Sequence, residues 1–168
     1  MSIATIKQNT TELENILEII SALPNVSDNK TIDSTLLSFI DGSITEFTIP
    51  SSFTTIRDGL FYGCENLTRV TIPNGIQTIG RSAFYLCGSL TSITLPSSIT
   101  SIDAYAFGQC TKITEYDFTS WTAIPTLSNT NAFTGISSQC VMKVPSALYD
   151  RMIAATNWST YKKYMVAV

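Results

Sequence analysis

Cysteine side chains are the first candidates for chemistry, because three of the four cysteines recur at a fixed interval. Cys64, Cys87 and Cys110 are evenly spaced, with one at every twenty-third position. If equivalent residues of successive repeats stack, their Cα atoms come within the roughly 4.4–6.8 Å that a disulfide requires. Stacked thiols can equally be small buried groups that only pack, and the C-x-x-C pairs that metal sites commonly use are absent from the sequence. We favour buried thiols over a disulfide, and a disulfide over a metal site.

Two carboxylates, Glu115 and Asp117, are the second candidates. On a β-strand, residues i and i+2 share a face, so these side chains can approach each other. Paired carboxylates can hydrolyse glycosides or bind calcium. Lys143 is placed to neutralise Asp117 from a neighbouring strand. We therefore favour a solvated polar surface over a cation site, and a cation site over catalysis.

The composition argues against several functions. The chain has no histidine, which removes Ser-His-Asp and Cys-His catalysis and most zinc sites, and it has no glycine-rich phosphate loop. Its net charge is −3, and it has no basic cluster beyond Lys162 and Lys163, so nucleic-acid binding is not expected. No apolar run approaches the roughly 20 residues that span a bilayer. We expect a protein that is not an enzyme, needs no cofactor or metal and does not insert into a membrane.

The elements that position these side chains are repeats with the same period as the cysteines. Such a fixed period, within the range of roughly 20–50 residues, is typical of solenoids. Besides the cysteines, three further sets of residues keep the interval: Phe61, Phe84 and Phe107; Pro50, Pro73 and Pro96; and Ile56, Ile79 and Ile102.

Each repeat has an L-x-x-V-x-I pattern whose last residues alternate at period 2, as a half-buried strand does. We predict such strands within 44–49, 67–72, 90–95 and 113–118. One unit cannot cover its own apolar face, whereas stacked units bury it between parallel strands about 4.8 Å apart. An I-x-x-I pair and an A-F-x-x-C segment follow each strand, and the A-F-x-x-C spacing predicts a helical or 3₁₀ turn.

Together, the L-x-x-V-x-I-P, I-x-x-I and A-F-x-x-C elements resemble the BspA-like leucine-rich repeat of surface antigens from host-associated bacteria. The resemblance covers about 44–118. It implies a repeat solenoid of the mainly β, α+β leucine-rich type, with helical caps at both ends. It also implies a non-enzymatic interaction module that recognises protein or glycan in the manner of a surface adhesin.

The sequence predicts four regions. Residues 1–24 form an amphipathic helix with apolar residues at alternating spacings of three and four, which suits either a folded-back cap or a short coiled coil that makes a homo-oligomer. Residues 25–43 are a capping segment, 44–145 the solenoid and 146–168 a C-terminal cap. The register shifts late in the solenoid, because Phe133 lies three residues further from Phe107 than the regular interval would place it.

The C-terminal region reads as one more strand followed by a cap. The strand "CVMKV" should point Cys140, Met142 and Val144 inward. Ser146 is a candidate N-cap of a helix with an apolar face of Leu148, Met152 and Ala155, and Trp158 should lie over the last repeat.

The exposed sheet face is the candidate binding site, and two columns of outward residues cross it. The columns are Glu46, Arg69, Ser92, Glu115 and Val141, and Thr48, Thr71, Thr94, Asp117 and Lys143. We expect ion pairs between Glu46 and Arg69 and between Asp117 and Lys143. A third surface feature, Tyr62, Tyr85 and Tyr105, lies beside the phenylalanines, where ridge packing is favoured over recognition.

Two functions remain from different classes. One is the surface recognition module, and the other is a phage or prophage tail-associated structural or receptor-binding protein, oligomerised through residues 1–24. The N-terminal segment 1–20 lacks the basic-then-apolar pattern of a Sec signal peptide, which argues against export by that route. Localisation therefore stays open between cell surface, phage particle and cytoplasm.

Overall fold

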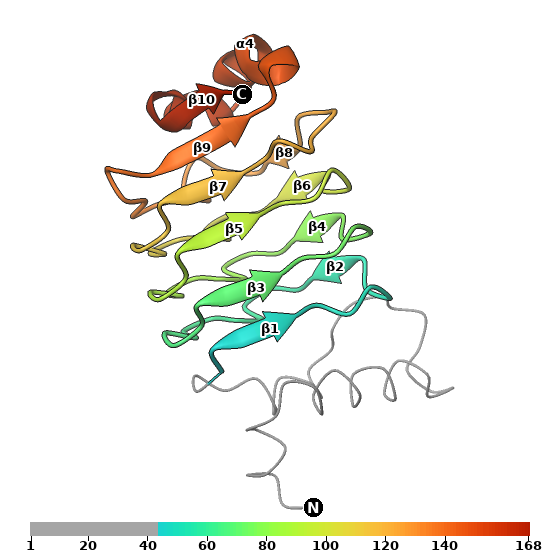
Figure 1. Ribbon diagram of the computed structural model, residues 1–168, viewed down its shortest axis with the longest axis vertical. Coiled ribbons are helices and arrows are strands. Elements are labelled where there is room, and N and C mark those ends of the chain that lie inside the picture. Colours follow the sequence, from blue (N-terminus) through green and yellow to red (C-terminus); the bar gives the residue numbers. More distant parts are fainter. Residues whose placement is uncertain (1–43) are drawn as a thin grey trace, which may run out of the picture.

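The computed structural model describes residues 44–168, in which successive coils of the chain stack along one axis (Figure 1). The helix predicted for residues 1–24, its coiled-coil alternative and the capping segment 25–43 lie outside the described residues. The stack confirms the predicted solenoid, and each coil contributes strands to two parallel rows.

The front row contains the four strands that the repeat pattern predicts, the last strand predicted at "CVMKV", and one further strand near the C-terminal end that was not predicted. They are β1 (Glu46–Thr48), β3 (Arg69–Thr71), β5 (Ser92–Thr94), β7 (Glu115–Asp117), β9 (Val141–Val144) and β10 (Met165–Ala167). They form two bonded groups, β1-β3 and β5-β7-β9-β10, and all their pairings are parallel. The register follows the repeat, because Phe47 lies opposite Val70 and Ile93 lies opposite Tyr116.

A second parallel sheet lies behind the first, and the sequence patterns did not predict it. Its strands are β2 (Thr55–Ile56), β4 (Thr78–Ile79), β6 (Ser101–Ile102) and β8 (Thr126–Leu127), in that order. Each holds the second residue of an I-x-x-I pair or its equivalent. Two-residue strands are too short to show a period, so only the buried isoleucine or leucine marks them in the sequence.

The third side of each coil consists of turns: each F-x-x-C unit closes an i→i−3 hydrogen bond, as the predicted 3₁₀ turn would, but the segment does not continue as a helix. Its N–H groups point alternately along the coil and across to the next coil. Cys64 N–H donates to Phe61 within its coil, at 3.1 Å, whereas Phe61 N–H donates to Ala83 of the next coil, at 2.7 Å. Left-handed residues such as Leu86, with φ 64°, reverse the direction of successive peptide groups. The turns therefore bond to neighbouring coils as strands would.

Rows of equivalent side chains fill the interior. Leu67, Leu90 and Ile113 are fully buried, which confirms their predicted inward orientation. Four phenylalanine rings stack along the axis with centroids 5.0, 5.1 and 5.4 Å apart and interplanar angles of 9°, 3° and 7°: Phe61, Phe84, Phe107 and Phe133. Such stacking brings the apolar surface of each coil against its neighbours, as the repeat predicts.

The longer unit that ends at Phe133 keeps its rings and strands in register by accommodating extra residues outside the core columns. β8 still pairs with β6, and Phe133 still stacks on Phe107, although both lie later in the chain than the regular interval would place them. Two extra residues lie between β7 and β8, and a third lies before Phe133. Trp121 fills the widened corner, where it stacks on Phe118 at 4.3 Å and donates its indole N–H to Leu95 O at 2.9 Å.

The C-terminal cap consists of α4 (Ser146–Ala154), the 3₁₀ helix η1 (Trp158–Tyr164) and strand β10. Leu148 and Met152 are buried, and Ala155 packs against the core, as predicted. Ser146 is the first residue of α4 rather than its N-cap, which is Pro145 without a capping side chain. The Ser146 hydroxyl instead donates to Val168 O at 3.0 Å, and this bond ties the helix to β10.

Side chains of the cap also take the place of a missing next coil. Ile102 O accepts from the backbone N–H of Ser128, while the equivalent Leu127 O accepts from the Asn157 side-chain amide at 2.6 Å. Trp158 donates its indole N–H to Pro125 O at 2.8 Å, and it is buried against the last coil, as predicted.

Tyr161 bonds to backbone groups of the last coil in the same way on the turn side. Phe107 N–H donates to a carbonyl of the next coil, that of Ala132, at 2.8 Å. The equivalent Phe133 N–H donates to the Tyr161 hydroxyl at 3.1 Å, and that hydroxyl donates to Thr130 O. The cap thus satisfies backbone groups that would otherwise be left at an open solenoid end.

Candidate binding face

The outward side chains of β1, β3, β5, β7 and β9 form one continuous surface, which we call the front face. Each alternates with a buried residue of its strand, so the predicted outward orientation is confirmed. The front face consists of Glu46, Thr48, Arg69, Thr71, Ser92, Thr94, Glu115, Asp117, Val141 and Lys143. The columns are set by register, since equivalent residues of paired strands lie side by side.

The first end of the front face carries the predicted ion pair. Arg69 Nη2 lies 2.6 Å from Glu46 Oε2, and these residues are direct partners in the register. Both side chains are about half exposed or more, at 69% and 49%. An exposed pair of this kind contributes only about 0–1 kcal/mol to stability. Both groups therefore stay accessible to a partner.

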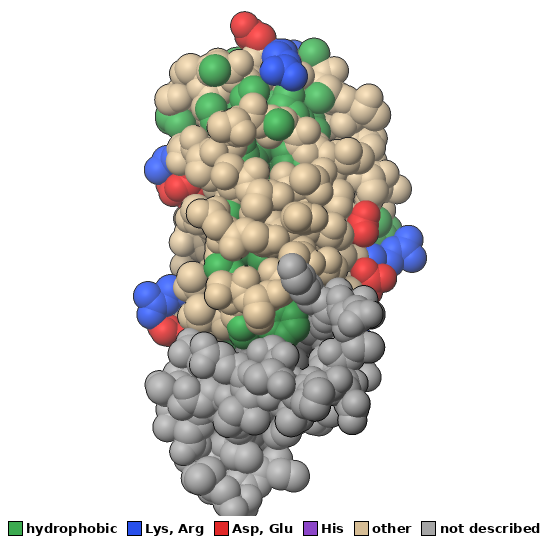
Figure 2. All heavy atoms as spheres, turned by 90° about the vertical axis from the view of Figure 1, so that its right-hand side faces the viewer, with side chains coloured by type: hydrophobic (Ala, Val, Ile, Leu, Met, Phe, Trp, Pro, Cys, Tyr) green, Lys and Arg blue, Asp and Glu red, His purple; other side chains and the backbone are tan. Residues whose placement is uncertain are grey.

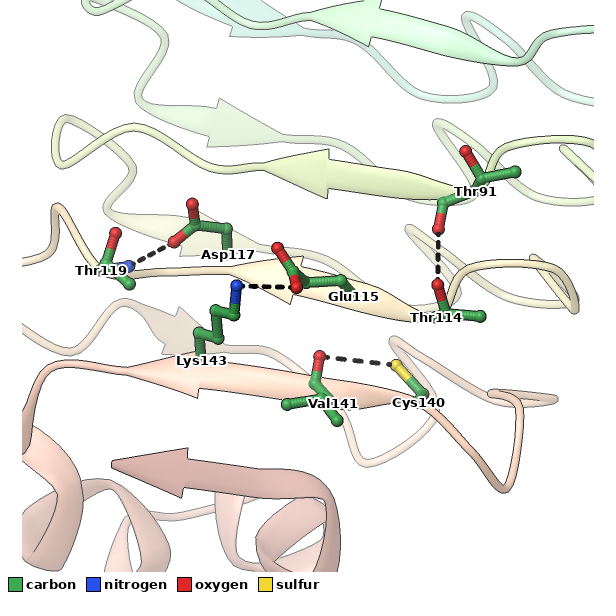
Figure 3. Close-up of polar contacts among 8 residues, drawn as sticks. All are labelled: Thr91, Thr114, Glu115, Asp117, Thr119, Cys140, Val141 and Lys143. Atoms are coloured by element: carbon green, nitrogen blue, oxygen red, sulfur yellow. Dashed lines mark hydrogen bonds and ion pairs between the residues drawn. The ribbon is translucent and has the colours of Figure 1, made fainter. Parts of the chain in front are cut away.

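The other end of the front face differs from the prediction. Lys143 is the register partner of Asp117, but its ammonium forms an ion pair with Glu115, at 2.8 Å (Figure 3). The long lysine side chain reaches the diagonal neighbour on the adjacent strand. Asp117 Oδ1 accepts from the backbone N–H of Thr119 at 2.9 Å. The predicted Asp117–Lys143 ion pair is thus replaced by Glu115–Lys143.

The two carboxylates and the lysine form a small charged group with an excess of negative charge. Lys143 lies between Glu115 and Asp117 (Figure 3). The hydrogen bond to Glu115 raises the pKa of Lys143, and the charge of Asp117 acts in the same direction. The lysine therefore remains protonated, and it neutralises part of the carboxylate charge. Within residues 44–168, no cluster of three or more His, Cys, Asp or Glu side chains is arranged to hold a metal ion.

The middle of the front face is neutral and hydroxyl-bearing. Ser92 and Thr94 are exposed, and Thr71 continues the second column toward the first ion pair. These side chains stand on strands whose inward residues are buried, so the surface beneath them is rigid. The arrangement offers hydrogen-bond donors and acceptors between two charged ends.

The cysteine column is buried, and its side chains are thiols rather than disulfides. Cys64, Cys87 and Cys110 have at most 3% of their surface exposed, which agrees with the packing interpretation. Cys110 Sγ donates to Phe84 O at 3.0 Å, and Cys87 Sγ makes the equivalent bond to the preceding coil at 3.2 Å. A hydrogen bond with Cys110, together with burial, raises the pKa of Cys87 far above its ordinary value. The Cys87 thiol is therefore protonated and unreactive.

The second sheet presents a further face, which the repeat pattern did not indicate. Thr78 and Ser101 occupy equivalent positions on β4 and β6, where the Ser101 hydroxyl donates to that of Thr78 at 3.2 Å. Figure 2 shows that side of the molecule as largely neutral, with charged side chains gathered along its two edges. This surface lacks the alternating charges of the front face.

The three tyrosines lie on the turn side, as predicted from their place beside the phenylalanines. Tyr62 stacks on Tyr85 at 5.4 Å, and Tyr85 meets Tyr105 edge-on at 6.0 Å. They pack with each other as a ridge, but Tyr62 and Tyr105 stay 58% and 37% exposed.

Among residues 44–168, the helices are too short or too polar to span a lipid bilayer.

Comparison with known proteins agrees with this architecture. A family model described as "BspA type Leucine rich repeat region (6 copies)" matches residues 30–149. A search of curated proteins gave no match.

Two solved structures are similar in fold. A leucine-rich repeat protein from Bacteroides ovatus is 22% identical over 76% of this chain and 31% of its own, with a TM-score of 0.58. A leucine rich cell surface protein from Faecalibacterium prausnitzii is 25% identical over 71% of this chain and 30% of its own, with a TM-score of 0.55. The chain thus spans less than a third of the length of either protein. Since the family model covers more than half of the sequence and the coils show the expected register, the chain belongs to the BspA-type leucine-rich repeat family.

Proposed function

We propose that the front face binds a protein partner at the bacterial cell surface, in the manner of an adhesin. Leucine-rich repeat folds of this family are generally non-enzymatic interaction modules. The F. prausnitzii protein is named as a cell surface protein, which supports the proposed location without assigning a ligand.

One observation favours the front face as the binding surface. The front face holds exposed hydroxyls between two weak ion pairs, Glu46–Arg69 and Glu115–Lys143, on a rigid sheet. Exposed ion pairs can be exchanged for pairs with a partner at little cost to the fold, because each contributes at most about 1 kcal/mol. Complementary charges at both ends would fix the register of the partner. The excess carboxylate of Asp117 favours a partner with a basic group at that end.

A double substitution on the neutral middle of the front face tests the proposal. Ser92→Arg with Thr94→Arg adds two bulky cations there and should weaken binding at least tenfold. The matched control, Gln77→Arg with Thr126→Arg, adds the same charge to exposed positions beside or on the second sheet and should leave binding unchanged.

The binding measurement uses the full chain against immobilised extracellular proteins and bacterial surface proteins, each native and enzymatically deglycosylated. Loss of binding after deglycosylation would assign recognition to the glycan rather than the protein. Equal loss in both double variants would place recognition elsewhere than on the front face. Surface labelling of intact cells with antibodies against the solenoid tests the location, since labelling only after lysis would contradict it.

The tail-associated alternative gains no support from the matched proteins. It depends on oligomerisation through residues 1–24, which lie outside the described residues.

A further inference from the structure

The tyrosines of the turn side surround a notch that the front-face function does not use. Tyr62 and Tyr85 occupy the same position in successive coils, and the next position in that column is Gly108. A Cβ atom on Gly108 would lie 2.7 Å from the Tyr85 ring, so the ring rests directly on this glycine. The column is therefore a pair of stacked rings that ends on bare backbone.

The neighbouring column forms the rest of the notch. Its members are Gly59, Ser82 and Tyr105, so two small residues are followed by a large one. The Tyr105 ring meets Tyr85 at 85°, and both rings stand beside Ser82 at the surface. A hollow of about 300 Å³ results, lined by Tyr62, Ser82, Tyr85 and Tyr105, which we call the tyrosine notch.

Stability does not explain Tyr105. Its backbone is left-handed, with φ 59°, where the equivalent residue of the first described coil is Gly59, with φ 64°. A bulky residue is disfavoured in this region. Its side chain is also 37% exposed, so core packing offsets little of this cost. Leu86 has the same left-handed backbone outside this hollow, so strain alone does not mark a site. At Tyr105 the strain coincides with a group of neighbouring aromatic rings, and strained residues often cluster at binding sites.

We propose that the tyrosine notch binds a proline-rich segment of a partner protein in the polyproline II conformation. Among the described residues, those that line the notch carry no charge, so its chemistry is that of aromatic rings and hydroxyls. A polyproline II segment is the complementary neutral ligand, because it presents pyrrolidine rings for aromatic contact and leaves its backbone carbonyls free for donors. The phenol and serine hydroxyls are such donors.

The spacing of the coils also suits this segment. A polyproline II helix repeats every three residues, at a rise of about 3.1 Å each, or about 9.3 Å per turn. Two coils of a parallel stack span about 9.6 Å, from a strand spacing of about 4.8 Å. Tyr62 and Tyr105 come from coils two apart. Because the two tyrosines stand in neighbouring columns, a segment that runs along the stack and slants from one column to the other can set residue i against Tyr105 and residue i+3 against Tyr62.

The test uses a capped decaproline peptide as the probe and a capped glycine-serine decamer as its control. Calorimetric titration of the full chain should show binding of decaproline at least tenfold tighter than that of the control. Tyr62→Ser should weaken it at least fivefold. Equal affinity for both peptides, or no heat with decaproline at millimolar concentration, would overturn the proposal. Preferential binding of neutral oligosaccharides at the notch would overturn it as well.

Tyr105→Gly separates a binding role from a structural one. If Tyr105 serves the ligand, this variant binds decaproline at least fivefold more weakly and unfolds at a higher temperature, because the strain is removed. Leu86→Gly is the matched control, since Leu86 has φ 64° but lies outside the notch. It should raise the unfolding temperature and leave binding unchanged. A lower unfolding temperature for Tyr105→Gly would show that the ring is structural and would refute the argument from strain.

The two proposals can fail independently. The Ser92→Arg, Thr94→Arg variant changes only the front face, so its decaproline binding should equal that of the unmodified chain. Loss of decaproline binding in this variant would place the peptide on the front face and overturn the notch.

Discussion

Two tyrosine hydroxyls in the core should respond in opposite directions to the same chemical change. The Tyr116 side chain is fully buried, and its hydroxyl has no hydrogen-bond partner among residues 44–168. Burial raises the pKa of this phenol well above its ordinary value, so the hydroxyl stays protonated and buried. An unpaired buried hydroxyl costs about 1–3 kcal/mol in proteins. Tyr116→Phe removes that cost and keeps the ring against Phe107 and Phe133.

The net gain is smaller than the burial cost, because the lost oxygen atom leaves a small gap. We expect Tyr116→Phe to raise the free energy of unfolding by about 1 kcal/mol. For a chain of 168 residues this corresponds to a rise of roughly 2–4 °C in the unfolding midpoint. Urea titration followed by circular dichroism gives the free energy, and a thermal scan gives the midpoint.

Tyr161→Phe is the matched control. The Tyr161 hydroxyl accepts from Phe133 N–H and donates to Thr130 O, so its removal leaves a buried N–H without a partner. Such a loss costs about 1–3 kcal/mol, so this variant should unfold several degrees lower. Destabilisation of Tyr116→Phe by more than about 1 kcal/mol would show that the Tyr116 hydroxyl has a partner after all. A Tyr161→Phe variant as stable as the unmodified chain would show that the Tyr161 hydroxyl bonds do not stabilise the fold.

Further substitutions test other layers of the structure. Leu90→Asp buries an unpaired carboxylate and should lower the free energy of unfolding by about 4 kcal/mol or more in urea titration, whereas Thr94→Ala on the front face should change it by less than about 0.5 kcal/mol; similar values for both would contradict the inward and outward assignments. Asn157→Ala removes the donor to Leu127 O and should cost about 1 kcal/mol in the same assay, and no change would mean that the cap does not stabilise β8. Burial raises the pKa of Cys140 to about 11 from an ordinary value of 9.0. Because the unfolded chain loses this proton first, stability should fall from about pH 9 to pH 11, and Cys140→Ala should reduce the slope by up to about 1.4 kcal/mol per pH unit; equal slopes for both proteins would contradict the shift.

The repeat pattern was sufficient to predict the interior and the front strands β1, β3, β5 and β7. Every L-x-x-V-x-I unit places its apolar residues inward, because alternation at period 2 decides the face of a strand. The same logic located the front face, including the Glu46–Arg69 pair, since the pairing register equals the repeat length. Equivalent residues of stacked coils must be neighbours, so two residues that lie one repeat length apart in the sequence are predicted to be in contact.

The differences arise where contacts do not follow the repeat interval. Lys143 forms its ion pair with Glu115 rather than with Asp117, because its long side chain extends to the diagonal neighbour on the adjacent strand. The sequence did not reveal the turns, because their left-handed positions hold glycine in one coil and Ser82 or Leu86 in the next. No repeated glycine therefore marks these positions. The cap bond from Asn157 to Leu127 joins residues that share no column of the repeat. The repeat interval cannot predict such contacts.

The two proposed binding surfaces differ in how stability constrains their residues. On the front face, an exposed ion pair or an exposed threonine contributes little to folding, so stability neither requires nor opposes the side chain that is present. At the tyrosine notch, the left-handed backbone of Tyr105 favours glycine, so stability opposes the side chain. A tolerated residue indicates only that its position accepts many side chains. A strained residue, where it also stands among exposed aromatic rings as Tyr105 does, indicates a use beyond folding. The notch is therefore the more specific inference, although the front face offers the larger surface.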